Sequence, residues 1–433
     1  MIRFFCIALV IVPITSVVAA AQSTLDITLR EAVRLAIRQS PETHLAQLEV
    51  EQANSDVALA RAERSPQLFA GSGLGYTDGI PQTVEGATPS VAQLTAKQPL
   101  FDAGRKQRIR QVRELADAAT HSAEGKRDRA VYRVGTLYLD FELSSRSADL
   151  LKTQLDHFRR IEEVTAARID EGREIPTALS RARLDTARAQ ERLRSAEAQF
   201  ELLEADLRRR LDLGVDVRLR PVAADSLGPL DLPETQTETT RRAVEDHPDL
   251  AALDAQLRSK GFQQKAAAGD RYPKLDLVAQ YALLAKFNNY DEFFNRFQRH
   301  NWQTGISFQV PLFAGKGVGE RIAKAKIEAR ALELQRKVKH ADIEIESLRS
   351  YESVQEAESQ TKLARMELDY ARENLSVLLA QFEEGRLAID PVERARIVES
   401  SAWQRLYESQ YSLHKAKLAL LHATGDLVEA FAD

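Results

Sequence analysis

The chain has 433 residues, of which 44% are apolar and 29% charged, and its 60 lysines and arginines against 64 aspartates and glutamates give a net charge of −4. This composition is too apolar and too balanced for a disordered chain, and the charge argues against a basic surface for nucleic acid, so no nucleic-acid partner is expected. The length allows roughly two to four domains. The single cysteine, Cys6, excludes an internal disulfide and a cysteine metal cluster.

Residues 1–21 have the form of a secretory signal peptide. Arg3 is the positive start, an apolar run follows, and Ala19-Ala20-Ala21 gives a small-x-small cleavage pattern before Gln22. A membrane anchor is the alternative, but the run is shorter than the roughly 20 residues of a helical span. Cys6 lies inside the run, so we do not expect it to carry a lipid. No later stretch is long and apolar enough for a helical span, so strands must make any membrane crossing.

The chain repeats itself once. Pro41 and Pro248 are 207 residues apart, as are Pro66 and Pro273. The segments QPLFDAGRKQRI (98–109) and VPLFAGKGVGERI (310–322) also match, and EGR occurs at 171–173 and at 384–386. A single long period indicates a duplication rather than a solenoid of short repeats. We therefore predict a first repeat at 22–214, a proline-containing linker at 215–238, a second repeat at 239–425 and a short tail at 426–433.

Each repeat is predicted to run helix, strand, strand, long helix, helix. In the first repeat these elements are expected at 30–64, 67–77, 90–98, 103–170 and 177–211. In the second they are expected at 241–270, 274–283, 302–312, 317–384 and 392–424. Within 274–283, Leu275, Leu277, Ala279 and Tyr281 share one face, and a period of two with one apolar face predicts a half-buried strand. Such strands suit a sheet inside a soluble domain, but their length also suits a tilted membrane-spanning strand.

The two long helices need partners along their sides. At ~1.5 Å per residue each is about 100 Å long. Val134, Phe141, Ala148 and Leu155 recur every seven residues, which is typical of a coiled-coil seam. Two shorter helices end to end, such as 30–64 and 177–211, match the length of one long helix. We therefore expect four helical columns and four strands per chain.

Closure of the sheet requires several copies of the chain. An open sheet edge is not tolerated in lipid, and known single-chain barrels start at about eight strands. Two copies would supply eight strands and three copies twelve. Twelve helical columns at ~10 Å spacing leave a lumen of about 28 Å, against about 15 Å for eight columns, which favours the trimer.

The chain resembles the TolC-like outer-membrane efflux family over essentially its whole mature length. The resemblance is carried by QPLFDAGRK (98–106) and VPLFAGKG (310–317), by both EGR segments and by YSLHKAKLALLHATGDL (411–427). It implies a mostly α fold with a small β part, assembled as a trimer with a 12-stranded β-barrel in the outer membrane and a 12-helix α-barrel across the periplasm. The family has a lipidated branch, but no cysteine lies at the predicted cleavage point, so the chain is expected in the non-lipidated branch.

The function implied by the resemblance is that of an exit duct in a tripartite efflux or type I secretion system. An inner-membrane pump and a periplasmic adaptor would open this passive conduit at its periplasmic tip. The alternative from another class is an exported coiled-coil scaffold, or the adaptor itself, without a pore. The sequence shows no catalytic constellation, and its eight histidines are scattered; we expect no enzyme activity, metal or cofactor. It does not indicate whether the cargo is a drug, a metal ion or a polypeptide.

Asp390 and Glu393 are the candidate pore-constriction residues. Around Pro391 they have the spacing of a helix start, with Asp390 as N-cap and Glu393 closing a capping box. In a trimer they would also form a ring of carboxylates, and the family resemblance implies acidic residues near this end. The two interpretations are compatible.

The remaining candidates lie at the turns and on the strands. Gly172 and Gly385 are predicted to end their helices in the left-handed conformation. Arg173 and Arg386 would contact an adaptor or bond the last helical carbonyls. The candidate lipid-interface aromatics are Tyr76, Tyr281 and Trp302, and the segment 284–301, with Phe293, Phe294 and Phe297, is expected outside the cell.

Overall fold

The structure is a computed structural model that describes residues 23–73, 90–222, 232–233, 235–245, 247–284, 298–312 and 316–431. The predicted signal peptide, Tyr76 and the three phenylalanines of the 284–301 segment lie outside the described residues. The chain divides into two compact units, and each is described by itself.

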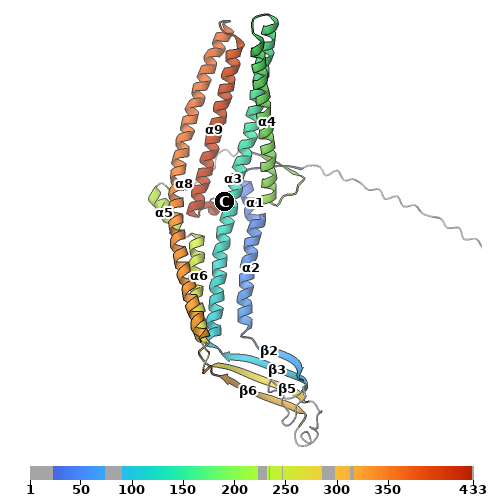
Figure 1. Cartoon of the computed structure of the whole chain (residues 1–433), viewed down its shortest axis with the longest axis vertical. Coiled ribbons are helices and arrows are strands. Elements are labelled where there is room, and N and C mark those ends of the chain that lie inside the picture. Colours follow the sequence, from blue (N-terminus) through green and yellow to red (C-terminus); the bar gives the residue numbers. More distant parts are fainter. Residues whose placement is uncertain are drawn as a thin grey trace, which may run out of the picture. The chain divides into compact units, whose positions relative to one another are not determined.

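The order of elements runs twice along the chain (Figure 1). Each pass gives a short strand, a short helix, a helix of 22 residues, two strands, a helix of 67 or 68 residues and a helix of 35 or 36 residues. The first pass is β1 (Ser23–Ile27), α1 (Leu29–Gln39), α2 (Pro41–Ala62), β2 (Gln67–Gly73), β3 (Ser90–Phe101), α3 (Ala103–Asp170) and α4 (Pro176–Arg210). The second is β4 (Val217–Pro221), α5 (Gln236–Glu245), α6 (Pro248–Gly269), β5 (Lys274–Leu284), β6 (His300–Gln309), α8 (Gly317–Glu383) and α9 (Ile389–Thr424), followed by α10 (Leu427–Ala430).

The prediction of single helices at 30–64 and 241–270 is wrong. Pro41 begins α2 and Pro248 begins α6, so each segment is split. Proline disfavours helical backbone at the residue before it, and Ser40 and His247 accordingly have ψ values of 132° and 121°. Proline itself suits the first helical position, because that N–H has no partner in the helix.

The predicted linker at 215–238 contains regular structure, which corrects a second expectation. β4 lies within it and pairs in parallel with β1, and α5 begins before the expected end of the linker. The described residues therefore hold six strands rather than four. Two form this small sheet, and the other four form a separate antiparallel sheet.

The first unit comprises residues 1–32, 137–226 and 368–407 and holds two helical hairpins. Helix α3 packs on α4, where Thr186 lies against the Phe158 carbonyl, and on α9, where Gln154 donates to Ser401. Helix α9 also packs on α8. The fully buried Tyr138 ring of α3 lies beneath the small sheet, with its hydroxyl 2.8 Å from the Ile27 carbonyl and 2.9 Å from that of Val222.

The second unit comprises residues 33–136, 227–367 and 408–433. Ion pairs join α2 to α3 (Glu49 with Lys126), α3 to α6 (Glu114 with Arg258) and α6 to α8 (Asp254 with Arg336). The end of α9 packs on α8 through small and branched apolar side chains (Val354, Ala357, Ala416 and Leu420). In this unit α3 thus contacts α2 and α6, and α8 contacts α5, α6 and α9.

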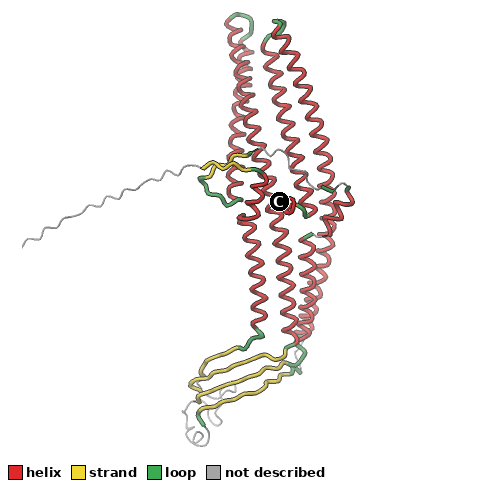
Figure 2. Tube along the Cα trace, turned by 180° about the vertical axis from the view of Figure 1, so that it is seen from behind, coloured by secondary structure: helices red, strands yellow, loops and turns green. Residues whose placement is uncertain are grey.

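The antiparallel sheet, coloured yellow in Figure 2, has the strand order β2-β3-β5-β6. Its register places rows of apolar side chains on one face, such as Leu94, Tyr281 and Trp302, and amide and hydroxyl side chains on the other, such as Thr95, Gln280 and Gln303. The apolar face is exposed, with Ile306 and Phe308 each 63% accessible. Within the described part of the chain, no helix is both long and apolar enough to cross a bilayer.

Candidate functional site

Both helical hairpins turn at a glycine. Gly172 has φ +72° and Gly385 has φ +73°, which confirms the predicted left-handed ends. The Arg173 amide donates to the Arg168 carbonyl at 2.8 Å and the Gly172 amide to that of Ile169 at 2.9 Å, the two bonds of a Schellman motif. The second turn repeats this arrangement, with the Arg386 and Gly385 amides donating to Gln381 and Phe382.

The two arginines that follow these glycines point into solvent. Arg173 is 76% exposed and pairs with Glu171, and Arg386 is 75% exposed and pairs with Glu384. Their side chains therefore contact a neighbouring carboxylate rather than the last helical carbonyls. Both remain accessible to a partner, and a role in binding an adaptor stays a prediction.

Asp390 and Glu393 do not form the predicted capping box. Helix α9 begins at Ile389, so Asp390 already lies inside the first turn, and its carboxylate accepts from Arg394 at 3.0 and 3.2 Å. Pro391 does not prevent this earlier start, because the first four N–H groups of a helix have no partner within it. The carboxylates of Asp390 and Glu393 are thus engaged with different partners.

The Glu393 side chain is buried, with 4% of it exposed, and lies against α3. Its carboxylate is 2.8 Å from His157 Nδ1 and 3.9 Å from Arg160. His157 is a contact that sequence reasoning missed. It lies two residues after Leu155 of the predicted coiled-coil seam, and a polar residue next to a heptad seam was the available signal.

A cavity of about 460 Å³ lies between α3, α4 and the start of α9. Asp390 and Arg394 line it from α9, opposite Arg181 and Asp185 of α4. The lining carries both signs of charge, and Asp390 keeps 29% of its side chain exposed. Asp390 is therefore the more accessible of the two predicted constriction residues.

Tyr281 and Trp302 come together on the apolar face of the sheet. They are paired in register on β5 and β6, and Trp302 is 68% exposed. The Tyr281 hydroxyl bonds His300 Nδ1 at 2.6 Å. An exposed aromatic pair with a polar group at its margin suits the boundary between lipid and water.

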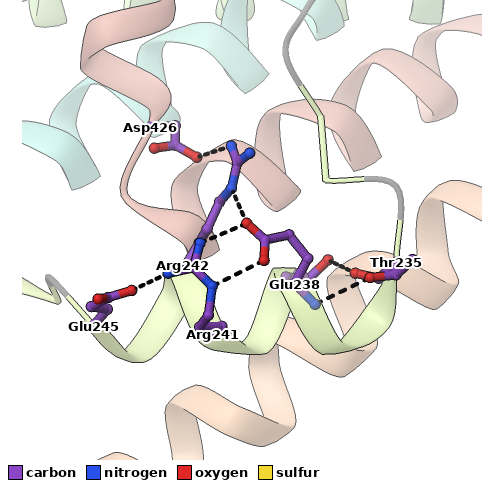
Figure 3. Close-up of polar contacts among 7 residues, drawn as sticks. Thr235, Glu238, Arg241, Arg242, Glu245 and Asp426 are labelled. Atoms are coloured by element: carbon purple, nitrogen blue, oxygen red, sulfur yellow. Dashed lines mark hydrogen bonds and ion pairs between the residues drawn. The ribbon is translucent and has the colours of Figure 1, made fainter.

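A polar network fixes α5 next to the end of α9, and no sequence pattern pointed to it (Figure 3). Glu238 accepts from Arg241 at 2.8 and 2.9 Å and from Arg242 at 2.9 Å. These hydrogen bonds lower the pKa of the Glu238 carboxyl to about 2. Arg242 also approaches Asp426, beyond α9, at 3.7 Å.

The start of α6 is capped by a histidine. His247 Nδ1 accepts from the Asp249 amide at 3.1 Å, which requires the neutral ring at that atom. Burial lowers the pKa of His247, and the charge of Lys339 lowers it further. Among the described residues, no group of three histidine, cysteine or acidic side chains is placed to hold a metal ion.

Comparisons with known proteins agree with this architecture. The family model described as outer membrane efflux protein matches residues 32–211 and 240–426. The chain is 20% identical to outer membrane efflux protein BepC of Brucella suis, over 96% of this chain and 86% of that one. It is 26% identical to protein CyaE of Bordetella pertussis, over 94% and 86% of the two chains.

Solved structures share the fold. The Campylobacter jejuni CmeC outer membrane channel superposes with a TM-score of 0.76 at 14% identity, covering 92% of this chain and 86% of that one. The outer membrane protein VceC of Vibrio cholerae gives a TM-score of 0.72 at 15% identity, covering 92% and 96%.

Proposed function

Because the chain belongs to the outer membrane efflux protein family, we propose that three copies of it form one continuous duct, open to the cell exterior and extending through the periplasm. Membership in the family places the protein in the outer membrane and supports a role as an efflux channel. The trimer, the partners and the opening mechanism are our inference.

The observation that carries the proposal is the two-faced sheet with free edges. One face is apolar and exposed, and the other carries amides and hydroxyls. Among the residues that the structure describes, β2 and β6 each pair on one side. In lipid such edges must be paired. Pairing β6 of one copy with β2 of the next closes a barrel, and three copies give twelve strands.

A stripe on α8 supports the same assembly. Ile327, Leu334, Val338 and Ile345 are 66%, 63%, 63% and 47% exposed. Their spacings of seven, four and seven residues follow a coiled-coil seam on the side of α8 away from α6. The exposed Leu45 and Leu48 of α2 supply an apolar surface for it on the next copy.

The hairpin turns are the proposed contacts with a periplasmic adaptor, which would couple the duct to an inner-membrane pump. Arg173 and Arg386 would meet the adaptor, and Asp390 would contribute to the narrow part of the pore. Glu393 would act differently, by holding α9 against α3. Opening would then require the two hairpins to separate while the duct itself stays passive.

Assembly is tested by native mass spectrometry of the protein extracted from outer membranes in mild detergent. We expect a mass of three mature chains, and ion conductance after reconstitution into a planar bilayer. Leu334→Glu places a charge within the α8 stripe and should lower the fraction of protein that is recovered as trimer. Gln335→Glu, which adds the same charge outside the stripe, should not. Recovery as a soluble periplasmic monomer, or a trimer that does not conduct, would refute the duct and favour the pore-free scaffold.

A further inference from the structure

The strands of the antiparallel sheet contain very few charges. Three residues in β2, β3, β5 and β6 carry a formal charge, namely Lys97, Lys274 and Asp276. All three lie on the face that also carries Thr95, Gln280, Gln303 and Ser307. Lys274 is at the first position of β5, whereas Lys97 and Asp276 pair diagonally across β3 and β5, with 2.9 Å between Nζ and Oδ2.

We propose that the Lys97–Asp276 pair sets the charge selectivity of the channel within the membrane. This inference rests on the proposed function, in which the polar face lines the water-filled lumen. At the position of the pair the two opposite charges cancel, so amides and hydroxyls dominate the wall there and solutes of either charge can pass. The remaining formal charge of these strands, Lys274, lies at the first position of β5. Three exposed carboxylates, or three more exposed ammonium groups, would make the same wall selective, because charges beside a low-dielectric wall concentrate counter-ions.

The accessibility of the pair supports this role. The Lys97 side chain is 47% exposed and that of Asp276 is 21% exposed, so each faces solvent on the polar side of the sheet. An ion pair this exposed adds little to folding stability. Its substitution should therefore leave the sheet intact while changing the local potential, which separates a permeation role from a structural one.

A cysteine reporter measures that potential directly. Ser307 pairs in register with Asp276 and is exposed on the polar face, whereas Phe308 points to the apolar face. The sole natural cysteine, Cys6, lies in the predicted signal peptide. Ser307→Cys in the purified trimer is treated with a cationic and an anionic methanethiosulfonate reagent of similar size, and the ratio of the two labelling rates reports the local potential. Phe308→Cys in the same detergent is the control.

In the Ser307→Cys chain, Lys97→Gln should raise the cation-to-anion ratio and Asp276→Asn should lower it. Each change should be about fivefold, the effect of one unit charge about 8 Å away in water on reagents of opposite charge. The double substitution should return the ratio to its starting value, and the ratio at Phe308→Cys should not follow these changes. The reversal potential in planar bilayers should shift in the same directions.

The outcomes separate the two proposals. If Ser307→Cys is labelled but its ratio stays constant across the four backgrounds, the selectivity role of the pair is wrong and the duct stands. If Phe308→Cys is labelled and Ser307→Cys is not, the polar face does not line an aqueous lumen, and the proposed function fails with the inference.

Discussion

The contact between Glu393 and His157 offers the sharpest test of how the duct opens. The Glu393 carboxylate is 4% exposed and its partner ring 18% exposed, with 2.8 Å between the bonded atoms. Loss of a hydrogen bond to a charged group costs about 1.5–3 kcal/mol. Arg160 is 68% exposed, so its pair with Glu393 adds at most about 1 kcal/mol. Glu393→Gln keeps one accepting oxygen. We therefore expect the contact between α9 and α3 to lose about 1–2 kcal/mol of stabilising free energy per chain, which raises the equilibrium constant for separating the two helices roughly tenfold.

Two measurements on the reconstituted channel check this value. Single-channel recording of Glu393→Gln should show a higher open probability at unchanged ion selectivity. Hydrogen exchange over the first turns of α9 should be about tenfold faster. The matched control is Glu399→Gln, which removes a carboxylate of the same helix that pairs with Arg372 of α8 at 3.6 Å and should leave the contact with α3 unchanged.

The more exposed Asp390 should behave in the opposite way. Asp390→Asn is expected to change selectivity in a salt-dependent manner, because an exposed charge is screened by salt, with little effect on exchange in α9. A result in which Glu393→Gln changes selectivity and leaves exchange in α9 unchanged would refute the argument, since it would make Glu393 a charge of the pore wall.

Three further outcomes follow from single residues. Tyr138→Phe keeps the buried ring but removes the hydroxyl that contacts the Ile27 and Val222 carbonyls. Loss of this hydrogen bonding should cost about 1–2 kcal/mol, so β1 amides should exchange about tenfold faster. Unchanged exchange would refute the role of Tyr138 in holding the small sheet. Burial lowers the pKa of His247, so its cap on α6 is fully present above the ordinary pKa of about 6.5 and is lost as pH falls through the lowered value. Amide hydrogen exchange at the start of α6 should therefore become faster in acid. It should not do so in His247→Asn, because asparagine caps a helix without titrating. Gly385 has φ +73° and open space where a Cβ would lie, so Gly385→Ala should destabilise its turn by about 1 kcal/mol through the backbone alone. The loss is measured as faster amide exchange in the turn. Gly385→Asn should recover part of the lost stability.

The long helices and the alternating strands were predictable because their signals are local and repeated. A stretch of 68 residues without proline predicted the long helix, and α3 occupies its predicted range of 103–170. An apolar period of two predicted the strand, and β5 matches its predicted range to within one residue. The breaks at Pro41 and Pro248 were also in the sequence. Apolar periodicity alone does not reveal them, because it takes no account of the steric effect of proline on the preceding residue.

The remaining features depend on partners distant in the chain. β1 is a strand because β4, almost two hundred residues later, offers it a parallel partner, and no pattern within five residues announces that. The capping box predicted at Asp390 and Glu393 does not form, because Arg394 binds the Asp390 carboxylate and His157 binds the Glu393 carboxylate. A helix-start motif describes local preference, and here contacts with other side chains decide where each carboxylate binds.

The twofold order of elements has a consequence for the symmetry of the assembly. β3 and β5 come from different halves of the chain and already pair side by side. In the proposed ring, the junction between β6 and the β2 of a neighbouring copy would be the counterpart of that internal junction, with the halves exchanged. The ring would therefore possess pseudo-sixfold symmetry, and its geometry is compatible with descent from six copies of an ancestral half-length polypeptide.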